Sequence, residues 1–561
     1  MKRFRALFLL CLLTLAAGAA FAQPSVVLIV NAASSIRPGL PNAGIAEGAI
    51  FSIYGSNMGP TVGVPATSFP LRTDFQGTSV KVTVGGTTVS AIIFFTRADQ
   101  VNAGLPSTTP VGTGTLTVTY NGQTSAAVPI VVVRNNVGMF TVNSQGSGDG
   151  IVTHADYSLV TASNAANSGE IVILWATGLG PVTFDETVAA PGGDLTNVPL
   201  EVFIGGRTAT ILYRGRNACC SSLDQINVQI PQGVTGCVVP LTLKIGNLVS
   251  NTVTMAVAPS GRQCTPTNSA VSQSDLTRIL AKGSYSAGGV TLSRTTSIST
   301  SPGFPPVVPP STTTTKTDGG AASFVKVSGN LTGLFNSQID TTIYGSCVVT
   351  TFSGNYNPLA GLTFQNLDAG ASIGVSGPNG NKTLLKQTAA GFTFYSATLG
   401  DGTPGNYLDA GQYTITGPGG PDVGSFTARL TLPQPLVWTN QASITTVNRA
   451  SGVTLTWSGG DPAGFVTISG SSFVLLSDGA SVVGATFTCT ARTSDGSFTV
   501  PAVVLLALPA SGSISAGGVT ITTPGSLSLT GSSAFTPFTA TGLDLAFASS
   551  VVTTSETVPY Q

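Results

Sequence analysis

The chain has 561 residues, of which only 8% are charged, with 23 basic and 23 acidic side chains in balance. This length is enough for roughly three to five domains of about 100–150 residues. Apolar residues come in short alternating runs rather than blocks of about 20, which argues against a transmembrane segment in the mature chain. No basic patch could neutralise several phosphates, which argues against nucleic-acid binding.

Residues 1–22 have the features of a secretory signal peptide. Three basic residues stand within the first five positions, an apolar core covers 6–17, and an Ala-x-Ala site ends at Ala22 before Gln23. An uncleaved membrane anchor is the alternative, but the core is short for one. Cleavage between Ala22 and Gln23 leaves 20 basic and 23 acidic residues, a net charge of −3. The protein is therefore predicted to be secreted or held at the cell surface, with the periplasm as an alternative.

Two consecutive stretches of the mature chain repeat one another. Asp99-Gln100-Val101-Asn102 returns as Asp224-Gln225-Ile226-Asn227, and Gly85-Gly86 returns as Gly205-Gly206. The second spacing is 120 residues and the first is 125, so the second stretch gains residues between its Gly-Gly turn and its Asp-Gln pair. Each stretch has short alternating strands with frequent turn signals, which is typical of an all-β domain of about 100 residues.

The motifs of these stretches carry a family resemblance. An opening strand ends at Gly59-Pro60 and again at Gly180-Pro181, and an apolar-Pro pair precedes each closing hairpin. Residues 24–262 resemble IPT/TIG immunoglobulin-like domains. More closely, they resemble an uncharacterised family of exported bacterial proteins in which "ATGLGP", "DQINVQIP" and "SNTVTMAV" recur. The resemblance implies export and tandem immunoglobulin-like β-sandwiches, and no known activity. Ala176 departs from it, because the first unit has Gly55 there.

The predicted domains follow from this repeat. Domain 1 covers 23–135 and domain 2 covers 136–263, both immunoglobulin-like. In domain 1, strands 80–84 and 89–95 flank Gly85-Gly86, and strands 116–120 and 126–133 flank Asn121-Gly122. Both dipeptides tolerate the positive φ that a two-residue hairpin turn requires.

The C-terminal half is predicted to be β-rich and β-sandwich-like as well, with domain 3 at 264–432 and domain 4 at 433–561, or a single larger unit. Residues 274–283 have a capping residue, an apolar stripe and a final Gly, which predicts a helix. The Pro- and Thr-rich segment 301–320 is predicted to be a linker or a long exposed loop. The phrase Leu-Asp-Ala-Gly occurs at 367–370 and 408–411, which predicts two similar strand–turn–strand pieces in one sheet.

The six mature cysteines of an exported chain are predicted to form disulfides. Cys219, Cys220, Cys237 and Cys264 allow three pairings. A bridge from the inserted loop to the tail of domain 2 would close about 45 residues and add about 3–4 kcal/mol by the loop-entropy model. Cys347 and Cys489 are left for each other, so no free thiol is expected.

No credible catalytic set is visible in the sequence. A Ser-His-Asp hydrolase would have to use His154, the single histidine, and the 370–374 segment fits G-x-S-x-G without the helix that must follow. One histidine and no C-x-x-C pair disfavour zinc. An Asp-Gly turn explains Asp149 without any ion, and calcium is an alternative for a set of loop carboxylates that lack EF-hand spacing. These are Asp149, Asp156, Asp185, Glu186 and Asp194. No cofactor or metal is expected.

Aromatic and repeated polar residues are candidate binding groups. Trp175, Trp438 and Trp457 stand among apolar strand residues, which favours core packing, whereas Tyr395, Tyr407 and Tyr413 could furnish an exposed platform for sugars. The recurring Asp and Asn of the two Asp-Gln motifs are best explained by bonds to adjoining backbone.

The predicted function is therefore non-catalytic. The chain is expected to be an adhesion, scaffold or polymer-binding protein whose partner is an extracellular polymer or protein. One alternative is an extracellular polysaccharide hydrolase or lyase with its site in 321–561. The other is a purely structural surface spacer.

Overall fold

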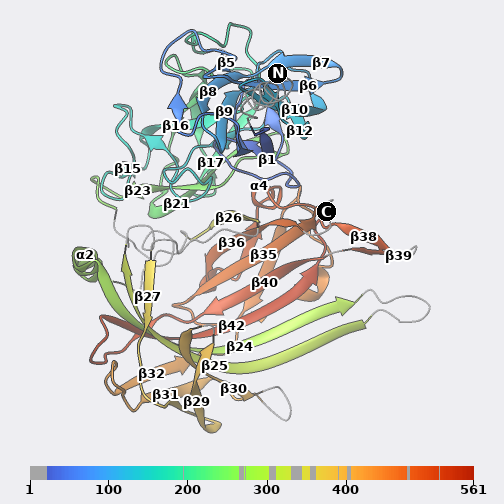
Figure 1. Cartoon of the computed structure of the whole chain (residues 1–561). Coiled ribbons are helices and arrows are strands. Elements are labelled where there is room, and N and C mark those ends of the chain that lie inside the picture. The colour runs from blue at the N-terminus through green and yellow to red at the C-terminus, as the bar shows by residue number, and fades with distance from the viewer. Residues whose placement is uncertain are drawn as a thin grey trace, which may run out of the picture.

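The computed structural model describes residues 22–193, 195–264, 271, 273–301, 311–329, 344–353, 362–389, 391–400, 406–476, 481–516, 519–522 and 524–561. Nearly all its regular structure is β, which confirms the predicted all-β class (Figure 1). Most of the predicted signal peptide lies outside the described residues, which begin at its last residue, Ala22. No helix in the described ranges has the length and apolar character needed to cross a membrane.

The first unit is a sandwich of two sheets. One sheet has the order β1 (Ser25–Asn31), β3 (Ile50–Ser56), β9 (Gln100–Gly104), β8 (Ile92–Thr96) and β4 (Val64–Pro65). The other has the order β2 (Ile45–Ala46), β12 (Val128–Val133), β10 (Gly112–Tyr120), β6 (Thr78–Val84) and β5 (Asp74–Phe75), with β7 (Thr87–Ser90) on β6 and β11 (Gln123–Thr124) on β10. Alternate residues such as Phe51, Ile53 and Val82 fill the space between the sheets.

The hairpin turns of this unit lie where they were predicted. Gly85 and Gly86 have φ of 57° and 83°, and Asn121 and Gly122 have φ of 47° and 80°. The predicted single strand 89–95 is wrong, however. It divides at buried Ala91 into β7 and β8, because the chain leaves one sheet there and enters the other.

The second unit repeats this plan. One sheet contains β13 (Gly138–Met139), β16 (Ile171–Thr177), β20 (Asp224–Gln229) and β19 (Thr210–Arg216), with β14 (Val152–Thr153) on β16. The facing sheet contains β15 (Ala166–Asn167), β23 (Val253–Ala258), β21 (Gly236–Ile245), β17 (Leu200–Ile204) and β18 (Arg207–Thr208), with β22 (Leu248–Val249) on β21. The parallel pairing of β2 with β12 recurs as β15 with β23, so the sequence repeat is a repeat of topology.

A long sheet dominates the C-terminal half (Figure 1). Its order is β26 (Ser346–Ser353), β36 (Val482–Arg492), β35 (Phe465–Leu475), β40 (Gly525–Ser532), β42 (Leu545–Val558), β24 (Ser284–Ser301), β25 (Ser311–Gly329), β30 (Phe392–Gly400), β29 (Gly380–Ala389), β28 (Ser372–Gly377), β31 (Gly411–Gly417) and β32 (Phe426–Leu432). β27 (Leu362–Asn366) pairs with β25, and β41 (Thr536–Pro537) with β42. The parallel pair β24–β42 joins strands from 284–432 to strands from 465–558, so one sheet runs through both ranges.

Smaller elements cover one face of this sheet or lie at its ends. They are α2 (Gln273–Lys282), β33 (Val437–Trp438), η2 (Gln441–Ser443), β34 (Val453–Ser458), η3 (Thr493–Asp495), β37 (Ser497–Val500), α4 (Ala502–Leu505) and the hairpin β38 (Ser513–Ala516)–β39 (Val519–Thr522). β33, β34, β37 and α4 pack on the sheet through Trp438, Leu455, Val500 and Leu505 respectively. α2 is the predicted helix.

The prediction of a linker or loop at 301–320 is wrong for its second half. Residues 311–320 begin β25, which pairs with β24 in an antiparallel hairpin from Ser284↔Ser328 to Ser301↔Ser311. The run of Thr residues supplies β-branched side chains, which favour strands. Residues 302–310 lie outside the described residues. The two Leu-Asp-Ala-Gly phrases precede β28 and β31, which are neighbours in the sheet as expected.

Candidate functional sites

A large uncharged surface lies on one face of the long sheet, over β36, β35, β40, β42, β24 and β25. Register places Ser and Thr side chains beside one another in three rows, two across all six strands and one across β36, β35, β40 and β42. We call this surface the hydroxyl face. Its rows are Thr490, Thr467, Thr530, Thr553, Thr295, Thr317; then Thr488, Ser469, Ser528, Ser555, Ser297, Thr315; then Thr486, Ser471, Ser526, Thr557.

The hydroxyl face is open to solvent and ordered. Apart from Thr490, each of its residues is partly or fully exposed, whereas alternate residues of the same strands, such as Ile468, Phe487 and Leu529, are buried in the core. Hydroxyls of neighbouring strands share hydrogen bonds, at 3.1 Å for Thr530–Thr553 and 2.8 Å for Ser471–Ser526. Strand geometry spaces the side chains by about 4.8 Å across strands and about 6.7 Å along them.

The hydroxyl face is not among the sites expected from the sequence. Its local signal is Ser or Thr at every second position, as in 467–471, 526–530 and 553–557. Such a signal marks the exposed side of a strand. It does not reveal that the strands are neighbours, because β24 and β42 pair across about 260 residues of chain.

All six mature cysteines are paired in disulfides. Cys347 pairs with Cys489 as expected, from opposite positions on β26 and β36. Cys237 pairs with Cys264, and Cys219 pairs with its neighbour Cys220. The conditional bridge from the inserted loop to the tail of domain 2 is therefore not formed. Cys219 and Cys220 bond each other within one turn, and Cys237 on β21 bonds Cys264 in the tail of the unit.

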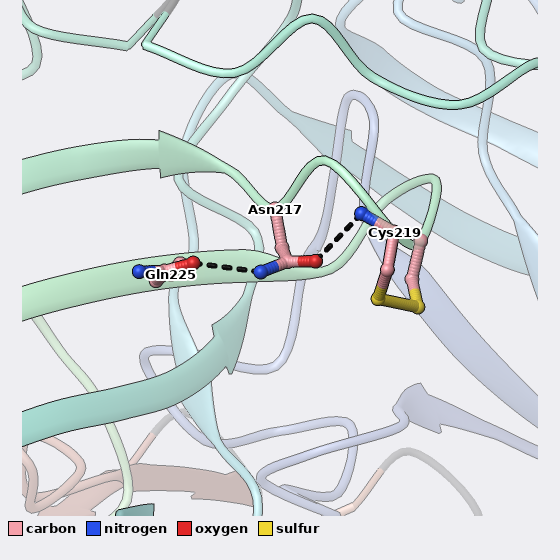
Figure 2. Close-up of a disulfide and its surroundings, with 4 residues drawn as sticks. Asn217, Cys219 and Gln225 are labelled. Atoms are coloured by element: carbon pink, nitrogen blue, oxygen red, sulfur yellow. Dashed lines mark hydrogen bonds between the residues drawn. A yellow bond between two sulfur atoms is a disulfide. The ribbon is translucent and has the colours of Figure 1, made fainter. Parts of the chain in front are cut away.

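The inserted loop, residues 217–223, is built around this adjacent pair (Figure 2). Asn217 accepts a hydrogen bond from the Cys219 N–H at 2.7 Å and donates to Gln225 Oε1 at 2.6 Å. On its other side the loop packs against the first unit, because a Cβ added to Gly104 would lie 3.1 Å from Ser222 Oγ. The insertion therefore helps to hold the two units together.

Buried polar groups complete the joint between the two units. Arg216, at the end of β19, is fully buried and forms an ion pair with buried Asp224, directly opposite on β20. Its guanidinium also donates to the carbonyl of Gly48 in the first unit at 2.9 Å and to that of Gly180 at 2.8 Å.

Two carboxylates lie at the same joint. Glu186 accepts hydrogen bonds from the N–H and hydroxyl of Ser107 at 2.7 and 2.9 Å. Burial still raises its pKa, although these bonds and Arg216 oppose the shift. Burial also raises the pKa of Glu47, with Glu186 adding to the effect and Arg134 opposing it.

The side chain of the single histidine, His154, is held by hydrogen bonds within the fold. Its Nδ1 lies 2.7 Å from Glu170 Oε1, and its Nε2 lies 3.0 Å from the backbone carbonyl of Asn164. Arg262 donates to the other oxygen of Glu170 at 2.6 Å. Because His154 is buried and both ring nitrogens are engaged, neither is available to a serine nucleophile. Ser372, the serine of the G-x-S-x-G segment, begins β28 and is followed by a hairpin into β29, not by a helix.

This cluster makes the second unit sensitive to acid. Burial opposes ionisation of Glu170, but hydrogen bonds from Arg262, His154 and the Asn167 N–H outweigh it and lower the Glu170 pKa from 4.5 to about 2. A carboxylate with a lowered folded-state pKa stabilises the fold above its unfolded-state pKa and loses that stabilisation as pH falls. We therefore expect stability to fall between about pH 4.5 and pH 2.

Denaturant unfolding across this pH range tests the expectation. Glu170→Gln should flatten the pH dependence in that window. Glu201→Gln is the matched control, because Glu201 forms a surface pair with Lys244 in the same unit and should keep the wild-type profile. An unchanged profile in Glu170→Gln would contradict the assignment.

The candidate calcium carboxylates do not lie together. Asp149 bonds Thr254 at 2.8 Å, Asp156 and Asp185 accept from Ser158 and Thr187 in their own turns, and Glu186 lies at the joint. Asp194 lies outside the described residues. No group of three or more His, Cys, Asp or Glu suited to a metal occurs within the described ranges.

The predicted tyrosine platform is wrong. Tyr395, Tyr407 and Tyr413 are buried, and their hydroxyls bond backbone groups. Tyr413 accepts from the Asp409 N–H at 2.9 Å and donates to the Asp409 carbonyl at 3.0 Å, the tyrosine-corner arrangement of β-sandwiches. Each Leu-Asp-Ala-Gly phrase thus supplies backbone groups that bind a buried tyrosine hydroxyl, that of Tyr395 for 367–370 and that of Tyr413 for 408–411.

The tryptophans divide into two kinds. Trp438 and Trp457 face each other on β33 and β34 and are 6% and 5% exposed, in agreement with core packing. Trp175 is only partly buried, and its ring lies beside that of Tyr157. The assignment of Trp175 to the core is therefore wrong, because β16 turns this side chain to the outer face of its sheet.

The repeated Asp-Gln motifs share one side-chain contact. Gln100 donates to Asn102 at 3.0 Å, and Gln225 donates to Asn227 at 2.9 Å. The aspartates differ, because Asp99 pairs with Arg97 at the surface whereas Asp224 is buried with Arg216. Asp224 forms the expected bond to adjoining backbone, because it accepts from the Leu179 N–H at 2.8 Å, whereas the Asn side chains bond the Gln of the same strand.

Comparisons with known proteins establish no family. No family model and no curated protein matches the chain. Among solved structures, a Gamma-CGTASE from Alkalophilic bacillus clarkii is 13% identical over 44% of this chain and 28% of its own, with a TM-score of 0.14. Domains 5-6 of the S-layer protein SbsC are 16% identical over 43% of this chain and 100% of their own, with a TM-score of 0.16.

A third match is SGBP-B of the Bacteroides ovatus mixed-linkage glucan utilization locus. It is 12% identical over 64% of this chain and 76% of its own, with a TM-score of 0.19. This chain spans less than a third of the length of the Gamma-CGTASE structure. TM-scores this low carry no information about function.

Proposed function

We propose that the protein is a non-catalytic, exported binding protein that attaches to a neutral, hydroxyl-rich polymer through the hydroxyl face. The observation that carries the proposal is the array of Ser and Thr side chains in register, two rows across six strands and a third across four, all but Thr490 partly or fully exposed. The predicted signal peptide and the resemblance to exported proteins with IPT/TIG-like repeats support export. The disulfides support an oxidising compartment.

The chemistry of the face favours a neutral partner. Its rows contain no charged residue, so a charged polymer would lose hydration without gaining an opposite charge. Hydroxyl groups donate and accept hydrogen bonds, which matches the hydroxyls of a neutral polysaccharide. The cross-strand bonds hold several of these side chains in place, which lowers the entropy lost on binding.

The extent of the face favours a polymer over a small molecule. Six strands span about 24 Å at about 4.8 Å per strand. A single hydrogen bond contributes a net of only about 0.5–1.5 kcal/mol, so useful affinity needs many contacts in register. A repeating chain supplies such contacts, and each contact formed raises the effective concentration of the next.

The test is sedimentation of the oxidised protein with insoluble neutral polysaccharides such as cellulose, chitin and mannan. We expect the wild type to bind at least one of them, with little dependence on salt because the contacts are uncharged. Thr467→Val/Thr530→Val/Thr553→Val removes neighbouring hydroxyls of one row and keeps the β-branched shape. Three lost hydrogen bonds should weaken binding about tenfold or more.

The matched control is Thr454→Val/Thr499→Val. These residues form an exposed, hydrogen-bonded cross-strand pair in the β34–β37 layer of the same half, away from the hydroxyl face. The control should bind as the wild type does. Absence of wild-type binding to every polymer, or equal loss in both variants, would contradict the proposal.

A further inference from the structure

The second unit carries an exposed aromatic pair on the outer face of its β13–β19 sheet. Tyr157 follows β14 and is 62% exposed, and Trp175 on β16 is partly exposed beside it. Their ring centroids are 6.2 Å apart and their planes are inclined by 33°. The indole N–H already donates to Thr153 Oγ1 at 3.1 Å, which fixes the ring.

The backbone presents Tyr157 in an unfavourable conformation. Its φ is 66°, in the left-handed region that glycine and asparagine tolerate and a bulky aromatic residue rarely occupies. The Tyr157 N–H donates to the His154 carbonyl at 3.0 Å, and the His154 N–H donates to the Ser158 carbonyl at 2.9 Å. Asp156 closes the turn by accepting from the Ser158 N–H at 2.9 Å.

The buried histidine cluster is the base of this turn. His154 is anchored through its ring to Glu170 and to the Asn164 carbonyl, so the turn cannot relax without breaking those bonds. A strained residue held rigidly, with its large apolar ring in solvent, has no folding advantage. Such an arrangement indicates a ligand for the ring.

Amide groups lie next to the aromatic pair. Gln225 is directly opposite Trp175 in the β16–β20 register, so the two side chains share a face of the sheet. Gln225 is held from one side by Asn217, which leads to the adjacent disulfide (Figure 2). From the other side it is held by Asn227. Each amide in the row retains hydrogen-bonding capacity beyond these contacts.

The geometry points to a stacking site for one pyranose ring of a neutral sugar on Tyr157 and Trp175. The ring faces offer flat apolar area to the C–H face of the sugar, and the amides of Gln225 and Asn227 bind its hydroxyls. A sugar combines an apolar face with a polar rim, as this patch does. The site is on a different unit from the hydroxyl face and does not depend on it.

Tryptophan fluorescence of the full oxidised chain reports this site directly. Of the three tryptophans, Trp438 and Trp457 are buried, so a ligand-dependent change arises at Trp175. Titration with methyl glucoside, methyl mannoside, methyl galactoside, N-acetylglucosamine and their β-linked tetrasaccharides should give a saturable change with at least one sugar. The expected Kd is on the order of 1 mM, as suits a site that contacts one ring.

Tyr157→Gly separates binding from folding. It should weaken sugar binding at least tenfold and leave the Tm unchanged or higher, because glycine adopts this φ without steric cost. Phe392→Gly removes another exposed aromatic ring, 55% exposed, from the C-terminal sheet and should bind as the wild type does.

Three outcomes would overturn the proposal. They are no fluorescence response to any of the sugars at 50 mM, unchanged affinity in Tyr157→Gly, and a Tm that falls in that variant together with binding. Self-association that Tyr157→Gly abolishes, without a sugar response, would assign the pair to contacts between copies instead. Sedimentation velocity measures that outcome.

Discussion

Arg216→Met is expected to destabilise the protein by about 3–5 kcal/mol, a large effect for a single side chain. The substitution leaves Asp224 buried without its cation, with the Leu179 N–H at 2.8 Å as a remaining neutral donor. It also removes the donors to the carbonyls of Gly48 and Gly180, so the joint between the units weakens as well. Denaturant unfolding of the full chain measures the free energy.

The repeat supplies a matched control for this prediction. Arg97 and Asp99 form the corresponding pair beside the first Asp-Gln motif, but their side chains are 43% and 61% exposed. Arg97→Met should therefore cost less than about 1 kcal/mol. Arg216→Met/Asp224→Leu should recover part of the loss, because no buried charge remains unpaired. Equal effects of the two Arg substitutions would contradict this account of the joint.

Loss of the Cys347–Cys489 disulfide is expected to cost about 5 kcal/mol in the loop-entropy model, because its cysteines are 142 residues apart. The bridge ties β26, at the edge of the long sheet, to β36. Cys347→Ala/Cys489→Ala should accordingly unfold at much lower denaturant concentration. The Cys237–Cys264 bridge, with a separation of 27, should contribute about 3–4 kcal/mol in the same model.

The adjacent pair is the control for this series. Cys219 and Cys220 are neighbours in sequence, so their bridge closes no long loop and constrains only the inserted turn. Cys219→Ala/Cys220→Ala should change the free energy of unfolding by less than about 1 kcal/mol. A larger loss in this control than in Cys347→Ala/Cys489→Ala would show that chain entropy is not the source of the stabilisation.

Local patterns determined much of the fold. Alternation of apolar and polar residues predicted β-structure, because side chains of a strand point to opposite faces in turn. Gly85-Gly86 and Asn121-Gly122 predicted hairpins through their tolerance of positive φ, and the two Asp-Gln motifs predicted two similar units. In each case the information lies within a few residues of the structure that it specifies.

Such local patterns could not predict most of the candidate sites. Trp175 and Trp457 both stand in apolar strand sequences, yet one faces solvent and the other the core, since the facing layer decides burial. The exposure of Tyr157 depends on a turn anchored through His154 to Glu170, sixteen residues away. Arg216 is held by a hydrogen bond to the carbonyl of Gly48, which belongs to another unit and is 168 residues away in the chain.

The sequence by itself thus determined the β-class, the duplicated sandwiches, the positions of several turns and the pairing of Cys347 with Cys489. Only the tertiary structure decided that Cys219 bonds Cys220, that one sheet runs through the C-terminal half, and that Thr295 lies beside Thr553 in the hydroxyl face. The physical reason is the distance along the chain over which each effect acts. Strand propensity and turn geometry are set by neighbouring residues, whereas strand order and register follow from the burial of apolar side chains contributed by the whole chain.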